Sequence, residues 1–207
     1  MDFEVPFAHY TRETYITILS QLQKDVTSQT EGLSKLSNLL TYGDQEKLSE
    51  SPVEEFARSI LHILDTTTSE DLGMLASKCV FGLLEAHTRS TSALLNNNGL
   101  HILASHLLNC KWYETSEFCI QSLFIISKYR AIDIGLQIGL DPFLKMIERF
   151  PITVQRTAMK AVVNVTDKDI TKDMTNHIPK LLDLFVNYLP VWDGQVSPIS
   201  FSQQKPA

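Results

Sequence analysis

Residues 154–165 read VQRTAMKAVVNV, and this stretch decides the fold that the sequence predicts. Small or apolar residues recur in it at i, i+4, i+7, i+8 and i+11, which is the spacing of one face of an α-helix. Two earlier stretches repeat the pattern, so that Cys79, Gly82 and Leu83, and then Cys119, Ser122 and Leu123, stand where this one has Ala158, Ala161 and Val162. Small side chains on such a face let neighbouring helices approach closely. The sequence therefore predicts a series of similar helices packed side by side.

A shorter apolar stripe with spacing i, i+3, i+7 recurs at a fixed period along the chain. Its four copies are Val53/Phe56/Ile60, Leu100/Leu103/Leu107, Leu140/Phe143/Ile147 and Ile178/Leu181/Phe185. Their starts are 47, 40 and 38 residues apart, close to the period of armadillo and HEAT repeats. The intervening stretches, roughly 43–50, 89–97, 130–138 and 168–176, are polar or weakly apolar and suit a brief first helix. Three helices per unit favour armadillo over HEAT repeats.

Both ends of the chain depart from the period. Two helices, at about 12–25 and 29–42, are expected ahead of the first stripe as an incomplete leading unit, and the tail gains Pro and Gln. We expect an N-terminal arm (1–13), a helical repeat domain (14–190) and a flexible tail (191–207). The predicted fold is all-α, an armadillo-type right-handed superhelical solenoid of about three full repeats and a partial N-terminal one.

Composition excludes several classes of function. Hydrophobic residues make up 43% of the 207 residues, with only 8 Gly and 8 Pro, which is typical of a soluble helical protein. A net charge of −6 disfavours nucleic acid and anionic membranes as partners. Three cysteines without metal-binding spacing indicate reduced thiols, and hence a cytoplasmic or nuclear location.

Four blocks carry a resemblance to a known family. They are TYGDQE (41–46), SPV (51–53), LEAHTRS (84–90) and ITVQRTA (152–158). In sequence and spacing they resemble the armadillo region of HECT-type ubiquitin ligases of the ubiquitin-fusion-degradation class, over roughly residues 14–190. The resemblance implies a module that recognises protein substrates carrying a fused ubiquitin or a degradation signal. It also implies that ubiquitin transfer belongs to a separate HECT domain with its own cysteine, which nothing in this chain resembles.

No catalytic residue or cofactor is therefore expected in this chain. The sequence has no P-loop, dinucleotide-binding glycine motif, HExxH or GxSxG, and none of Cys79, Cys110 or Cys119 inherits the transfer role. Two alternatives stay open. One is a free-standing armadillo adaptor outside the ubiquitin pathway, and the other is a small helical enzyme.

The third helices of armadillo units line a groove, so the helical register yields candidate partner-binding residues. Steps of four and seven residues back from Asn164 give Lys160 and Thr157. The same frame in the two preceding units gives Phe118, Gln121 and Ile125, and then Lys78, Phe81 and Glu85. Nuclear-import receptors of the armadillo class carry Trp and Asn at these positions. The nine positions of this chain include one Asn and no Trp, which disfavours binding of nuclear-localisation signals. A mixed groove with aromatic anchors suits a folded surface or an amphipathic peptide, unless Phe118 and Ile125 belong to the core.

Other conspicuous residues have plainer interpretations. His101, His106, Cys110 and Cys119 supply soft ligand atoms, but a structural zinc needs four in closed spacing, so we expect packing and no metal. Trp112-Tyr113 is either a loop anchor or an exposed hot spot. Asn164-Val165-Thr166 matches the glycosylation sequon by chance, because it lies on a predicted helix.

The last predicted helix is apolar around much of its girth and has no successor, as if the array were cut short. An exposed apolar surface predicts association through this end of the chain.

Overall fold

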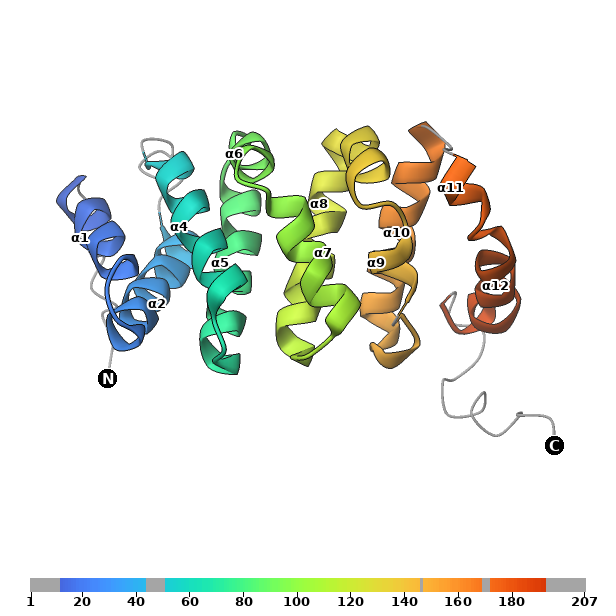
Figure 1. Ribbon diagram of the computed structural model, residues 1–207, viewed down its shortest axis with the longest axis horizontal. Coiled ribbons are helices and arrows are strands. Elements are labelled where there is room, and N and C mark those ends of the chain that lie inside the picture. The colour runs from blue at the N-terminus through green and yellow to red at the C-terminus, as the bar shows by residue number, and fades with distance from the viewer. Residues whose placement is uncertain (1–11, 44–50, 146, 169–171, 193–207) are drawn as a thin grey trace, which may run out of the picture. The chain divides into compact units, whose positions relative to one another are not determined.

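The computed structural model describes residues 12–43, 51–145, 147–168 and 172–192, and in the last stretch the side chains of 174–184 and 186 (Figure 1). The described residues form helices and no strand, which confirms the all-α prediction. None of these helices is long and apolar enough to cross a bilayer. The chain divides into two compact units, Met1–Gly99 and Leu100–Ala207, which are described in turn.

The first unit contains both leading helices and the first predicted stripe. Its helices are α1 (Arg12–Leu22), α2 (Val26–Tyr42), α4 (Val53–Thr66), α5 (Glu70–Ala86) and α6 (Ser90–Asn96). Here α5 packs against both α2 and α4, and α6 packs against α4. The short helix expected within 89–97 is therefore present as α6, whereas the one expected at 43–50 lies almost entirely outside the described residues.

The second helix begins at residue 26, three residues before the expected start, because Asp25 caps it. The Asp25 carboxylate accepts hydrogen bonds from the backbone amides of Thr27 at 3.0 Å and Ser28 at 3.1 Å. These are amides that the first turn of a helix leaves without partners. The bond from the Ser28 amide is the largest of the effects that lower the pKa of Asp25.

Helix α5 shows why its inner positions must be small. A Cβ atom placed on Gly82 would lie 3.3 Å from Cβ of Leu40 on α2, closer than most such contacts. Cys79 is fully buried beside it, and its thiol donates a hydrogen bond to the carbonyl of Leu33 at 3.3 Å. Burial raises the pKa of the Cys79 thiol to about 12, so this cysteine is a packing residue and not a nucleophile.

The second unit repeats this arrangement around two long helices. Its elements are α7 (Gly99–Asn109), α8 (Tyr113–Gln137), α9 (Asp141–Leu144), the 3₁₀ turn η1 (Ile147–Arg149), α10 (Ile152–Lys168), α11 (Lys172–Thr175) and α12 (Ile178–Trp192). Extensive packing joins α8 to α10. Helix α8 kinks at Arg130, which has φ −133° and ψ 42°. A predicted third helix and the short first helix of the next unit are thus continuous here.

Two apolar stripes differ from their prediction. Leu140, Phe143 and Ile147 are buried as expected, but they lie on the short α9, its flanking residue and η1 instead of one continuous helix. On α12 the predicted stripe holds only in part, because Ile178 is 48% exposed and Leu181 half-buried whereas Leu184 is buried. The side chain of Phe185, the third residue of that stripe, lies outside the described residues. Apolar residues surround α12, so the periodicity did not single out its buried face.

A buried pair of polar residues, Ser51 and His87, lies at the C-terminal end of α5. The hydroxyl oxygen of Ser51 lies 3.0 Å from Nε2 of His87, and both residues are buried. The Ser90 hydroxyl donates to the carbonyl of Leu83 at 2.7 Å and also bonds the carbonyl of His87. Burial lowers the pKa of His87, and the positive charge of Arg89 lowers it further. The folded state therefore favours the neutral imidazole of His87.

We expect this pair to make stability depend on pH. The unfolded chain binds a proton at His87 near the ordinary pKa of about 6.5, whereas the folded chain binds it only at lower pH. The free energy of unfolding should therefore fall as pH drops from 7.5 through 6.5 and below. Urea unfolding followed by circular dichroism at pH 7.5, 6.5 and 5.5 measures this. The His87→Gln variant should lose part of the dependence, and the exposed-site control His62→Gln should keep it. Equal slopes in both variants would contradict the assignment.

Candidate functional site

Six of the nine predicted groove residues lie on two helices that pack together in the second unit. Phe118, Gln121 and Ile125 project from α8, and Thr157, Lys160 and Asn164 project from α10. Lys160 is exposed and the other five are half-buried, whereas the alternating positions Leu123, Ala158 and Ala161 are fully buried. Phe118 and Ile125 are thus neither core nor fully exposed residues. We call these six residues the ladder surface.

The other three predicted residues lie in the first unit. Lys78 and Glu85 are exposed on α5, and Phe81 is half-buried between them. They share the face of α5 opposite Cys79 and Val80, which are fully buried. The face of α5 predicted from the helical register is thus its less buried face, and the role of these residues in binding stays a prediction.

Asn164 joins the two helices of the ladder surface. Its Nδ2 donates a hydrogen bond to the Ser127 hydroxyl at 2.9 Å, and that hydroxyl donates to the carbonyl of Phe124 at 2.7 Å. A side-chain amide has two donor hydrogens and a carbonyl acceptor, so this bond uses one donor and fixes the orientation of the group. An amide held in this way is suited to binding the backbone of a partner.

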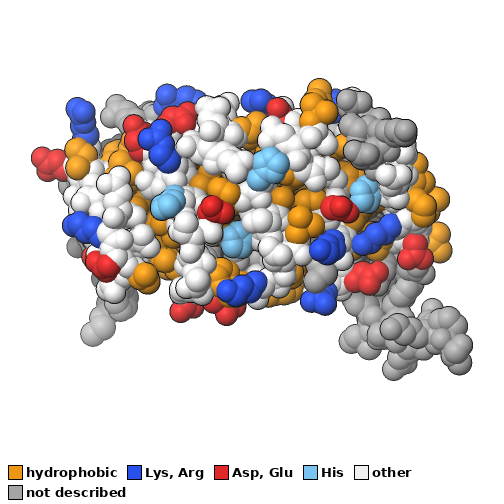
Figure 2. Space-filling view, viewed as in Figure 1, with side chains coloured by type: hydrophobic (Ala, Val, Ile, Leu, Met, Phe, Trp, Pro, Cys, Tyr) orange, Lys and Arg blue, Asp and Glu red, His pale blue; other side chains and the backbone are white. Residues whose placement is uncertain are grey.

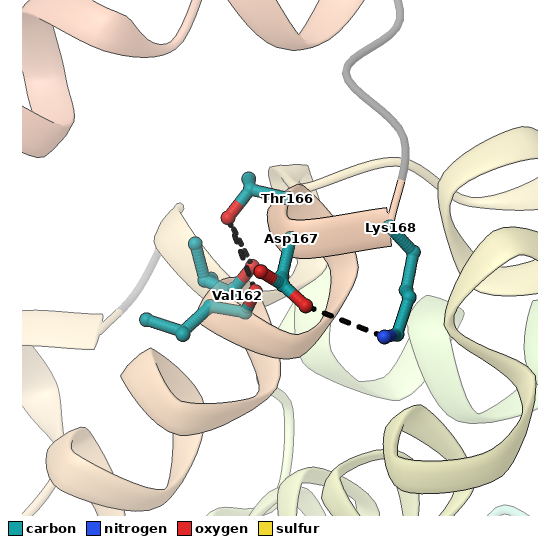
Figure 3. Close-up of polar contacts among 5 residues, drawn as sticks. Val162, Thr166, Asp167 and Lys168 are labelled. Atoms are coloured by element: carbon teal, nitrogen blue, oxygen red, sulfur yellow. Dashed lines mark hydrogen bonds and ion pairs between the residues drawn. The ribbon is translucent and has the colours of Figure 1, made fainter.

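The same residue begins the glycosylation sequon, and the structure shows the sequon in a regular helix. The Thr166 hydroxyl donates back to the carbonyl of Val162 at 3.0 Å (Figure 3). The neighbouring ion pair between Lys168 Nζ and Asp167 Oδ2, at 3.4 Å, is exposed, and such pairs contribute about 1 kcal/mol or less. These contacts complete the C-terminal turn of α10 and supply no further site.

The positions taken at steps of four and seven residues along each helix do not include one aromatic residue of this face. Phe124 is half-buried on α8, with Lys128 Nζ 4.5 Å from its ring centre. Gln121 Nε2 also donates to Glu117 Oε1 at 3.4 Å. A complete helical wheel around Gln121 includes Glu117, Phe124 and Lys128, so the sequence contained this signal. The ladder surface is therefore flanked by an aromatic ring and a cation, features that are common in binding surfaces.

The soft ligand atoms near Cys110 do not converge. His106 stacks on Trp112 with ring centres 6.1 Å apart, and Cys119 is fully buried, which raises its thiol pKa. Within the described residues no group of three or more His, Cys, Asp or Glu side chains is placed to hold a metal ion. Trp112 is buried, as a loop anchor would be, whereas Tyr113 is partly exposed and its ring centre lies 5.3 Å from that of Phe150.

One side of α12 is apolar and exposed. Ile178, Leu182 and Val186 are 48%, 59% and 75% exposed, and their i, i+4, i+8 spacing places them on one side of the helix. Figure 2 shows hydrophobic side chains at the surface near the end of the second unit, where Figure 1 places α12. We call these three residues the α12 stripe. It is the surface through which the sequence predicted association.

Comparison with known proteins identifies the family. The family described as E3 ubiquitin-protein ligase TRIP12-like, TPR repeats, matches residues 8–134. The chain belongs to this family. It is 24% identical over 168 residues to the E3 ubiquitin-protein ligase UPL3 of Arabidopsis thaliana and 22% identical over 143 residues to UPL4 of the same plant. These matches cover 81% and 69% of this chain but only 9% and 10% of the relatives.

A solved structure shares the fold. The crystal structure of an engineered protein from the Northeast Structural Genomics Consortium matches with a TM-score of 0.64 and 18% sequence identity, over 74% of this chain and 62% of that one. At this identity the likeness concerns the fold alone. The all-α solenoid class is confirmed.

The finer features of the predicted fold stay predictions. They are the right-handed superhelix, the number of about three repeats and the domain boundaries at residues 13 and 190. The family description speaks of TPR repeats, which have a period of 34 residues. The spacings of 47, 40 and 38 residues in this chain are longer and keep the armadillo type as our prediction.

A double-mutant cycle tests the bond between α8 and α10. Asn164→Ala and Ser127→Ala should each lower the free energy of unfolding by about 0.5–1.5 kcal/mol. The double variant should lose less than the sum of the two, because both single changes remove the same hydrogen bond. Chemical denaturation of the four proteins measures the coupling. Strict additivity would show that the bond is not formed in solution.

Proposed function

We propose that this chain is a substrate-recognition module of a HECT-type E3 ubiquitin ligase in ubiquitin-dependent protein degradation. The observation that carries the proposal is the ladder surface, which presents an oriented amide, half-buried aromatic and aliphatic side chains and a lysine on two rigidly packed helices. Membership of the TRIP12-like family and the likeness to two Arabidopsis ligases support the pathway. The partners we propose are proteins with a fused ubiquitin or a degradation signal, met in the cytoplasm or nucleus.

The chain spans about a tenth of the length of these relatives. That ubiquitin transfer takes place in a ligase containing this chain is therefore part of the proposal, and we propose that another domain carries it out. The alternative remains a free-standing adaptor with a different protein partner. Binding to a ubiquitin-bearing substrate distinguishes the two.

The direct test is binding to ubiquitin fused through an uncleavable bond to a reporter protein, measured by biolayer interferometry. We expect saturable binding that Lys160→Glu weakens about fivefold, the size of a lost exposed charge contact. Phe118→Ala, within the ladder surface, should weaken it about tenfold, as removal of an aromatic anchor does. Neither change should alter helicity, because Lys160 is exposed and Phe118 is half-buried.

The matched control is Lys145→Glu, which reverses another exposed charge of the second unit, on a residue outside the ladder surface. It should bind as the unmodified chain does. Absence of binding to the fusion protein would favour the adaptor alternative. Equal loss in the Lys145→Glu and Lys160→Glu variants would show that the ladder surface is not the contact.

We also propose that the α12 stripe pairs with the stripe of a second copy of this chain. Three exposed aliphatic side chains in one row are the surface on which two such helices pack. Light scattering after size exclusion should show a mass that rises with protein concentration. Leu182→Lys should keep the chain monomeric, whereas Ile16→Lys, at an equally exposed aliphatic residue of α1, should not. A concentration-independent monomer mass for the unmodified chain would refute this pairing.

A further inference from the structure

The second unit contains an open pocket of about 570 Å³ that the ladder surface does not include. It lies where α8 ends, between the turn that follows that helix and the segment joining α11 to α12. Its lining is Gly135, Leu136, Gln137, Ile138, Gly139, Leu140, Asp141, Met174, Asn176 and His177. We propose that this pocket binds a lysine side chain of a protein partner.

The floor of the pocket is built by close packing. A Cβ atom on Gly135 would lie 2.6 Å from Cε of Met174, the flexible end of that side chain, so the glycine lets the methionine of α11 lie close against α8. Met174 and Leu140 are buried beneath the pocket, whereas Leu136 is 68% exposed at its edge. The wall is therefore aliphatic and accessible, and it suits a chain of methylene groups.

The turn after α8 adds electronegative groups. The amides of Ile138 and Gly139 both donate to the carbonyl of Ile134 at 3.0 Å. The next three carbonyls belong to lining residues 135–137 at the end of the helix, where carbonyls have no partner within the helix. The C-terminal end of a helix carries partial negative charge and favours cations.

Asp141 supplies the charge that selects the ligand. Its side chain is 69% exposed, and its Oδ1 lies 3.7 Å from Nε2 of His177, which is charged only if protonated. Among the lining residues of the described structure there is no Lys or Arg. The pocket thus offers one carboxylate and several carbonyl oxygens but no fixed cation.

Charge and shape together point to lysine. An ammonium group has three donor hydrogens and no acceptor, which matches a carboxylate beside helix carbonyls. Its four-carbon stem matches the aliphatic side chains of Leu136 and Ile138 in the pocket lining. An inorganic cation would leave that wall unused, and an acidic side chain would be repelled by Asp141. A lysine of a partner protein meets both requirements.

The inference is tested by nuclear magnetic resonance with a small probe on the whole chain. Nα-acetyl-lysine methylamide is titrated while the amide signals of Gly135 and Gly139 are followed. We expect saturable shifts at these two glycines. Nα-acetyl-norleucine methylamide keeps the aliphatic stem without the ammonium group and should bind at least about fivefold more weakly, the effect of one partly exposed ion pair.

Three variants decide whether the pocket carries the effect. Asp141→Asn should weaken the lysine probe about fivefold, and Glu148→Gln, an exposed carboxyl outside the lining, should leave it unchanged. Leu136→Lys places a cation at an exposed position and should abolish binding without a change in helicity. Equal affinity for the norleucine probe, equal loss in the Glu148→Gln variant or no shift at the two glycines would overturn the proposal. None of these outcomes depends on binding at the ladder surface.

Discussion

Close approach between long helices at their small residues is the constraint on which the rest of the structure depends. In the first unit Gly82 of α5 meets Leu40 of α2 with almost no space for a further methyl group. In the second unit Ala158 and Ala161 of α10 are fully buried, as is Ser122 of α8. The Ser122 hydroxyl has no hydrogen-bond partner among the described residues, so its small size is what suits it to the position. Larger residues would force the helices apart.

This packing also determines which helix faces reach the surface. Because the small faces of α8 and α10 turn inward, the opposite faces of both helices reach the surface in register. The hydrogen bond between Asn164 and Ser127 then holds one helix to the other and orients a polar group. The ladder surface is built on helices alone and includes no loop.

The second unit carries two further surfaces. One is a pocket that the sequence did not predict, and the other is the α12 stripe, on the helix through which the sequence predicted association. The pocket beside Asp141 lies where Met174 of α11 packs closely against Gly135 of α8. The α12 stripe is exposed because Leu184, and not Ile178, faces the rest of the unit. Both surfaces lie after the kink at Arg130. The three surfaces therefore differ in chemistry. The ladder surface is mixed and polar, the pocket is electronegative, and the α12 stripe is aliphatic.

By itself the sequence determined the helical class and the helix face that carries the nine predicted groove residues, none of which is fully buried. It could do so because a helix face is a local property, set by spacings of three and four residues. Asp25 also marked a helix start in the sequence, although its effect was missed. Only the tertiary structure decided the partner of His87, the bond from Asn164 to Ser127 and the buried face of α12. Those depend on contacts between residues far apart in the chain, and on a helix with apolar residues all round, periodicity cannot choose between faces.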